Sequence, residues 1–337
     1  MVSSRTFNQT PHGTYGQYIP GVPREQFASV GDRVCLLQLS ENERSRTNIG
    51  VVNLDGSELV LAVELFAHDG TIFDTLTATL APFSCDQLDG VLRRWAPVDD
   101  AYAVVSPVSD DAAFLAYASA VDRVSGDPIY ISSAAAASDA LWVPAAAHVG
   151  GVAGTNWRTD LEVLSSGTTQ ARFQIEQQPP SGEPPVFTLE AGSSVRFGDV
   201  LSEVLDVTGS SALRIRILDG EVMVTSRTYN DLGDRTYGQF IPGLPVSHAI
   251  AQGVEARLVQ LSSSTDEQSG FRTNIGFANV SADEIEVRID LYNGDGSHLG
   301  ARNLTIAGSG YLQDGAVFKK ISAGNVADGY AVLRSDT

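Results

Sequence analysis

The sequence predicts an all-β protein built from three tandem antiparallel β-sandwiches of immunoglobulin-like type. Three observations predict this class. A short motif recurs three times roughly 110 residues apart, a spacing that is typical of whole repeated domains and too long for a solenoid repeat. The copies contain runs in which apolar and polar residues alternate. Turn signals rich in glycine and aspartate follow these runs, as in antiparallel sandwiches.

The repeated motif reads RTNIG at residues 46–50, RTDL at 158–161 and RTNIG at 272–276. A second element recurs at a similar interval: TYGQYIPG at 14–21 returns as TYGQFIPG at 236–243. A weaker version, DPIYI, stands in the middle position and begins at Asp127. Since both elements keep their order and spacing, we interpret the chain as three copies of one unit.

The third copy contains the clearest strand. Its residues 285–291 alternate between apolar and charged side chains, which is the period of a half-buried strand, and NGDG at 293–296 supplies a tight turn. The first copy matches this pattern over 59–65, before a turn at 68–70, and the middle copy has a looser counterpart at 171–177. Each copy therefore predicts antiparallel strands.

Two short helices are predicted near residues 86–95 and 199–206. Apolar side chains recur there at i, i+3, i+4 and i+7. We interpret each segment as a loop helix that caps one end of a sandwich.

Two strand-like runs flank Asp219-Gly220, a dipeptide that favours β-hairpin turns. The second run, VTSRTYN at 224–230, has a near-copy at 2–8, VSSRTFN. The first run has a near-copy at 329–335, GYAVLRS. We therefore expect the two near-copies to pair side by side, as the two arms of the hairpin are expected to pair.

These matches predict the domain boundaries. The sandwiches are expected at residues 33–133, 141–245 and 254–337, and residues 1–22 form a separate strand segment. Because the third sandwich lacks the strands that end the other two, the N-terminal segment is expected to complete it. Completion within one chain closes a ring of three units, whereas completion between chains gives a head-to-tail polymer.

The candidate assembly residues lie in these matching segments. They are Val2, Ser4, Arg5 and Phe7 near the N-terminus, Tyr330, Val332 and Leu333 near the C-terminus, and the motif arginines Arg46, Arg158 and Arg272. An arginine that recurs with polar neighbours is expected to tie strands or adjoining units together through forked hydrogen bonds. A ligand-binding arginine is the alternative.

Aromatic side chains offer a second use for the same segments. The pairs Tyr15/Tyr237 and Trp157/Phe271 have the flat apolar rings on which a sugar stacks. Aromatic residues beside strand motifs usually belong to the core, however, and we interpret these four residues as core residues.

The formal net charge of −19 argues against nucleic-acid binding, since phosphates need a basic surface. No apolar run approaches the roughly 20 residues of a membrane helix, so no membrane insertion is expected. Residues 1–10 do not resemble a signal peptide, and we expect a secreted or cell-surface protein whose sequence here is processed or trimmed. The two cysteines, Cys35 and Cys85, are compatible with a disulfide or with two free thiols.

A search for catalytic chemistry finds no nucleophile elbow, phosphate loop or zinc motif. The five histidines, His12, His68, His148, His248 and His298, have no metal-ligand spacing. Aspartates at 99–100 and 110–111 leave Ca²⁺ binding as a minor alternative. We therefore predict a protein that is not an enzyme and that has no cofactor and no metal.

The motif RTNIGxxN, the Asp-Gly turn, and SRTYN leading to GQFIP resemble uncharacterised tandem sandwich repeats of secreted and cell-surface bacterial proteins. The resemblance covers all three units and is weakest in the middle one. It implies an extracellular, non-enzymatic module and brings no catalytic residues.

We therefore expect a structural subunit of an extracellular filament, tube or surface layer, which assembles with copies of itself by strand complementation between chain termini. The alternative is an adhesin or an array of carbohydrate-binding modules.

Overall fold

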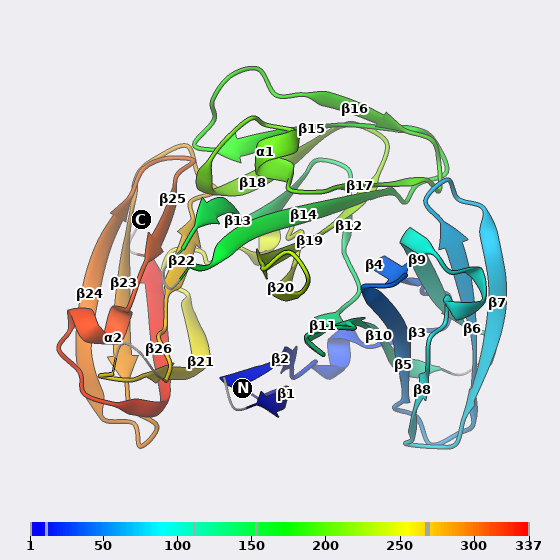
Figure 1. Ribbon diagram of the computed structural model, residues 1–337, viewed down its shortest axis with the longest axis horizontal. Coiled ribbons are helices and arrows are strands. Elements are labelled where there is room, and N and C mark those ends of the chain that lie inside the picture. Colours follow the sequence, from blue (N-terminus) through cyan, green and yellow to red (C-terminus); the bar gives the residue numbers. More distant parts are fainter. Residues whose placement is uncertain (1, 11–12, 111, 152–153, 267–269, 336–337) are drawn as a thin grey trace.

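The chain folds mainly into antiparallel strands, which form three groups of sheets around a common centre (Figure 1). The structure is a computed structural model that describes residues 2–10, 13–110, 112–151, 154–266 and 270–335. Every strand pair within these residues is antiparallel. The all-β prediction is thereby confirmed, and the folding pattern is that of β-sandwich-like tandem repeats.

The first group consists of two sheets that share one core. One sheet has the strand order β4-β9-β6-β7 and the other has β11-β10-β5-β8, with β3 beside β10. The 3-10 helices η1 (Arg24–Gln26) and η2 (Arg93–Trp95) lie before and within the group. Leu36 and Leu61 from the first sheet meet Ile49 and Phe114 from the second, and all four are fully buried. The strands are β3 (Ala28–Ser29), β4 (Val34–Glu41), β5 (Ser45–Asn53), β6 (Leu59–Ala67), β7 (Ile72–Leu80), β8 (Cys85–Leu88), β9 (Val98–Pro107), β10 (Ala113–Asp122) and β11 (Pro128–Ile131).

The second group repeats this layout, but its two layers are continuous. Strand β13 pairs with β18 in one layer and, at its end, with β14 in the other. The remaining order is β12-β19-β14 on one side and β18-β15-β16 on the other, with β17 beside β14 and β20 beside β19. The elements are β12 (Ala136–Ala137), β13 (Ala140–Gly150), β14 (Asn156–Ser165), β15 (Ala171–Gln178), β16 (Val186–Leu189), β17 (Ser194–Phe197), α1 (Val200–Glu203), β18 (Gly209–Asp219), β19 (Val222–Asp231) and β20 (Thr236–Pro242).

The third group has a four-stranded sheet, β21-β26-β23-β24, and a sheet of only two strands, β22-β25, among the described residues. Its buried core is the smallest of the three and centres on Ile289, Leu291 and Phe318. The 3-10 helix η4 (Val246–His248) precedes it. The elements are β21 (Glu255–Ser263), β22 (Ile275–Ala278), β23 (Ile285–Tyr292), β24 (His298–Ile306), β25 (Tyr311–Asp314), α2 (Val317–Lys320) and β26 (Val326–Ser335).

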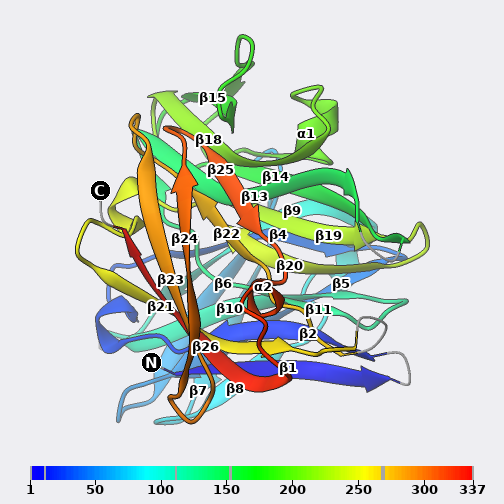
Figure 2. The ribbon, with the colours of Figure 1, turned by 90° about the vertical axis from the view of Figure 1, so that its left-hand side faces the viewer.

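The N-terminal segment forms a separate two-stranded sheet. Strand β1 (Ser3–Thr10) pairs with β2 (Gly13–Pro20) along its whole length, and neither pairs with a strand of the third group. The two strands run side by side near the lower edge of the view in Figure 2. The expected completion of the third group by this segment is therefore not made within the chain.

The predicted hairpin around Asp219-Gly220 is wrong. Gly220 has φ +75°, so the tight turn exists. Strand β18, however, pairs with β13 and β15, whereas β19 pairs with β12, β14 and β20 in the other layer. The turn joins two facing layers, because each strand already has partners within its own layer.

The helix predictions are partly confirmed. Helix α1 lies inside the segment predicted at 199–206. Most of the segment predicted at 86–95 is instead strand β8 and a turn, and only η2 is helical. Helix α2 occupies the equivalent place in the third group and was not predicted.

The first and second groups are joined by an apolar contact and by a hydrogen bond to the buried carboxyl group of Glu162. Cys35, Leu37 and Tyr102 from the first group pack against Leu164 and Met223 from the second. Both cysteines are free thiols, and burial raises the pKa of the Cys35 thiol to about 11.

Glu162 stands beside this apolar contact and is fully buried. Its Oε2 accepts hydrogen bonds from the backbone N–H of Gln38, at 2.7 Å, and from Nη2 of Arg196, at 3.1 Å. Burial outweighs the attraction of Arg196, and together with the nearby Asp100 carboxylate it raises the pKa of Glu162 to about 8.

This shift predicts that stability falls as pH rises. The folded protein retains the proton of Glu162 up to about pH 8, whereas an unfolded chain loses it near pH 4.5. The contribution of this group is therefore fully present below about pH 4.5 and is lost as pH rises through 8. Urea unfolding at several pH values is expected to show this decline in the native protein and a flatter profile in Glu162→Gln. Equal profiles for the two proteins would contradict the assignment.

Candidate assembly site

The hairpin β1–β2 reproduces the internal pair β19–β20 in detail. Arg5 Nη2 donates to Thr14 Oγ1 at 3.0 Å, and Arg227 Nη2 donates to Thr236 Oγ1 at 2.6 Å. In both pairs the residues stand nine positions apart. The matching sequences therefore fold into the same local structure, although β1 lacks the neighbouring strand that β19 has.

A second pair of contacts supports this equivalence. The Arg5 guanidinium lies 5.0 Å from the centre of the Phe7 ring, and that of Arg227 lies 4.7 Å from the Tyr229 ring. Such cation–π contacts fix the side-chain orientation of the arginine. The two hairpins therefore share the orientation of this arginine as well as its hydrogen bond.

Burial is where the two hairpins differ. Val224 of β19 is fully buried, because β14 covers one edge of its strand and the core lies beneath it. The equivalent Val2, just before β1, is 78% exposed, and Phe7 is 48% exposed. Ser4 is exposed as well, whereas its counterpart Ser226 is fully buried. The N-terminal hairpin therefore presents to solvent the residue types that β19 buries.

Strand β22 is the matching surface. Its counterparts have neighbours on both edges, since β5 pairs with β8 and β10, and β14 pairs with β17 and β19. Among the described residues β22 pairs with β25 alone. The other edge of β22 therefore has no ladder partner among the described residues, although β13 of the second group lies close to the strand.

The repeat fixes the register in which a strand like β1 fits this edge. In the second group Thr225 lies opposite Glu162. Ser3 stands at the position of Thr225, and Gly276 stands at the position of Glu162. A strand added in the same register therefore places Ser3 opposite Gly276.

Within the chain, the hairpin lies elsewhere. Strand β2 contacts β11 of the first group, and the ring of Tyr15 stacks on that of Tyr237 at 4.2 Å between centroids. One hydrogen bond reaches the third group, from Gln260 Nε2 to the carbonyl oxygen of Ser3, at 3.3 Å. The hairpin is thus packed on all three groups but does not form a sheet with β22.

The C-terminal candidate residues are not brought to the hairpin. Strand β26 lies between β21 and β23, so both its edges are already occupied. Val332 and Leu333 are buried, and Tyr330 stacks on Tyr292 with 4.8 Å between ring centroids. The predicted pairing of 2–8 beside 330–335 is therefore wrong. In the repeat, the strand equivalent to β14 is β22, with which β1 does not pair in this structure.

The motif arginines occupy equivalent positions in sequence but have different surroundings. Arg158 Nη1 donates to the carbonyl oxygen of Trp157, and its Nε lies 3.1 Å from Asp199 Oδ2. Arg46 is half-buried and Arg272 is exposed. Their role in assembly stays a prediction.

The threonine and the asparagine or aspartate of the motif make the contacts that recur. Each threonine Oγ1 accepts a hydrogen bond from a backbone N–H of β4, β13 or β21, respectively. The pairs are Thr47 with Ser40, Thr159 with Ala147 and Thr273 with Ser262, at 3.1, 2.8 and 3.2 Å. The recurrence of the motif is the sequence signal for these contacts. From the sequence, the motif's structural role is assigned to its arginine, whereas the recurring hydrogen bonds are made by its threonine.

The motif residue after the threonine, an asparagine or an aspartate, hydrogen-bonds to the turn before the short helix. Its Oδ1 accepts a backbone N–H from a residue with positive φ in all three groups. The pairs are Asn48 with Gly90, Asp160 with Asp199 and Asn274 with Ala316, at 3.0, 3.2 and 3.0 Å. The motif therefore has a structural role. It hydrogen-bonds to the neighbouring strand β4, β13 or β21 and to the loop before the short helix.

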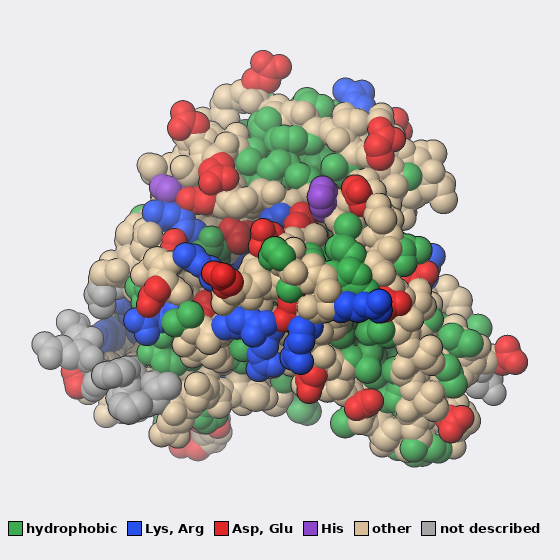
Figure 3. Space-filling model, turned by 45° about the vertical axis from the view of Figure 1, so that its right-hand side comes forward, with side chains coloured by type: hydrophobic (Ala, Val, Ile, Leu, Met, Phe, Trp, Pro, Cys, Tyr) green, Lys and Arg blue, Asp and Glu red, His purple; other side chains and the backbone are tan. Residues whose placement is uncertain are grey.

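The remaining surface features are few. In the part of the chain that the structure describes, no three His, Cys, Asp or Glu side chains are grouped to hold a metal ion. No helix among the same residues has the length and apolar character to cross a membrane. On the face drawn in Figure 3, Lys and Arg side chains gather near the middle, with acidic side chains around them.

No protein-family model and no curated protein matches the chain. One solved structure aligns with it, described as the crystal structure of a tetra-tandem repeat in the extending region of a large adhesion protein. The alignment covers 99% of this chain and 81% of that one, with 13% sequence identity and a TM-score of 0.14. A similarity this low carries no argument about function.

Proposed function

We propose that the protein is a non-enzymatic structural subunit of an extracellular homopolymer. Its three sandwich units are linked head to tail between chains, and the hairpin β1–β2 of one copy completes the third unit of the next. The added strand β1 lies beside β22, as β19 lies beside β14 in the second unit.

One observation carries this proposal. Val2 is 78% exposed, whereas its counterpart Val224 is fully buried in an otherwise equivalent hairpin. Burying an apolar side chain of this size stabilises by roughly 1.5–3 kcal/mol. Strand addition gains that burial and also pairs the backbone groups on the open edge of β22.

Exchange between copies requires the hairpin to leave its place within its own chain. There Tyr15 stacks on Tyr237 and β2 contacts β11, and β1 does not pair with β22. Because the donor and acceptor surfaces differ, the contact is heterologous and propagates into a filament unless the rotation closes a ring.

Sedimentation velocity tests this function. The native protein is expected to form larger species as its concentration rises. A synthetic peptide of residues 1–22 is expected to cap the open edge and to reduce these species to monomers. A scrambled peptide of the same composition serves as the control. A protein that stays monomeric at every concentration would contradict the proposal.

The alternative function, an adhesin or carbohydrate-binding array, is favoured by a different observation. An aromatic cavity lies where the N-terminal hairpin meets segments of the first and second units.

A further inference from the structure

The cavity lies where the equivalent strands β2, β11 and β20 come together. Its volume is about 690 Å³, which is in the range of small-molecule sites. The TYGQYIPG element and its two relatives supply most of its lining. Each of the three strands pairs on one side only among the described residues, with β1, β10 and β19 respectively. Three open strand edges therefore border the cavity.

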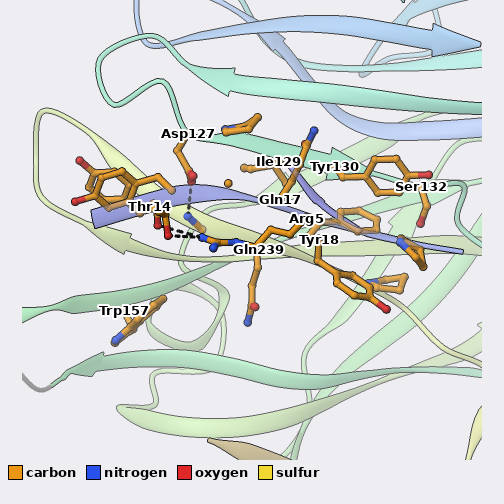
Figure 4. A pocket seen from close by; sticks show the side chains of 18 residues that line it. Arg5, Thr14, Gln17, Tyr18, Asp127, Ile129, Tyr130, Ser132, Trp157 and Gln239 are labelled. Atoms are coloured by element: carbon orange, nitrogen blue, oxygen red, sulfur yellow. Dashed lines mark hydrogen bonds between the residues drawn. The ribbon is translucent and has the colours of Figure 1, made fainter. Parts of the chain in front are cut away.

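Aromatic rings form much of the wall. Tyr15 and Tyr237 stack with their planes 28° apart. Tyr18, Tyr130 and Trp157 stand at other points around the same cavity (Figure 4). Tyr18 is 54% exposed, so its ring is open to solvent. The interpretation of Tyr15, Tyr237 and Trp157 as core residues is therefore wrong, since all three line this cavity.

Polar groups interrupt this apolar wall. Asp127 is only 2% exposed, and its Oδ2 accepts a hydrogen bond from the backbone N–H of Gly238 at 2.9 Å. Burial raises the pKa of this carboxyl to about 6. Gln17 Oε1 is shielded from solvent and has no hydrogen-bond partner among the described residues. Gln239 adds a second amide.

The charge of the lining selects the class of ligand. Arg5 and Asp127 are its charged residues, one of each sign, and Arg5 is already bonded to Thr14. Anionic ligands would therefore meet no free cation in the described lining, and cationic ligands would meet a single carboxylate that is already bonded to Gly238. Aromatic rings combined with amide groups and a carboxylate suit a molecule with apolar C–H faces and many hydroxyl groups.

We propose that this cavity is a binding site for a neutral carbohydrate, with sugar rings stacked on Tyr18 and Trp157 and hydroxyl groups bonded to Gln17, Gln239 and Asp127. The site goes beyond the assembly function, because it binds a small molecule and not another copy of the chain. It belongs to a copy whose own hairpin β1–β2 stays in place, since Gln17 and Tyr18 of that hairpin line it.

Isothermal titration of the full chain against a panel of neutral oligosaccharides of hexoses and N-acetylhexosamines tests the site. At least one member is expected to bind the native protein. Tyr18→Ala and Gln239→Ala are expected to weaken that binding at least about tenfold, as for the loss of about 1.4 kcal/mol. Both residues are exposed enough for the variants to fold, which circular dichroism verifies.

Phe83→Ala is the matched control, since Phe83 is an aromatic residue that is 75% exposed and lies outside the cavity. It is expected to bind like the native protein. The proposal is overturned if no neutral oligosaccharide binds, if only charged saccharides or peptides bind, or if Tyr18→Ala and Gln239→Ala bind as tightly as the control.

Discussion

Replacing Val224 with aspartate is expected to remove most of the stability of the second unit. Val224 is fully buried in the core with Leu161 and Val163. The substitution loses the burial of an apolar side chain and places a carboxylate where the described structure offers it no partner. A loss of about 4 kcal/mol or more is expected, against a total of about 5–15 kcal/mol for a typical domain. Urea unfolding monitored by circular dichroism measures it.

Val2→Asp is the matched control for this change. The two valines occupy the same place in equivalent hairpins, but Val2 is 78% exposed. Its replacement is expected to change the free energy of unfolding of the monomer by no more than about 0.5 kcal/mol. Comparable destabilisation by both substitutions would show that Val2 is already buried within its own chain.

The same Val2→Asp variant is expected to abolish self-association. Strand addition to β22 would bury the new carboxylate where Val224 is buried in the second unit. Burying that carboxylate costs a few kcal/mol of binding free energy, which corresponds to a dissociation constant at least about 100-fold higher. Sedimentation velocity measures the shift toward monomer. Val108→Asp, at a side chain 63% exposed, is the surface control and is expected to associate normally.

Local sequence patterns predicted the strands well. The alternation at 285–291 corresponds to β23, and the repeats of the RTNIG motif stand in or beside β5, β14 and β22. Alternation is a local property, since each side chain of a strand faces one side or the other of its own sheet. It therefore identifies a strand without identifying its neighbour.

Strand partners could not be predicted in the same way. Asp219-Gly220 specifies a turn with positive φ, and that turn is present. Whether the flanking strands pair or face each other depends on β13, β14 and β15, which are far away in the sequence. The same error was made at the chain ends, where residues 2–8 were assigned to an edge of β26 although β21 and β23 occupy both of its edges.

The candidate site was predicted in part. The near-copy of 224–230 at 2–8 identified a hairpin segment whose equivalence the contacts of Arg5 and Arg227 support. The central cavity was missed, because Tyr15, Tyr237 and Trp157 each resemble a core residue in its own strand. Only the packing of the N-terminal hairpin against the first and second units makes them line a hollow.

Cross-linking tests the central claim most directly. Ser3→Cys and Gly276→Cys are made in separate chains, each with Cys35→Ala and Cys85→Ala, so that each chain has one thiol. Directly opposed residues of paired strands have Cβ atoms about 4.5–5.5 Å apart, close enough for a disulfide after small adjustment. On mixing under oxidising conditions, a covalent heterodimer of the two chains is expected to predominate over either homodimer. Statistical mixing of homodimers and heterodimers, or no cross-link at all, would contradict strand exchange between copies.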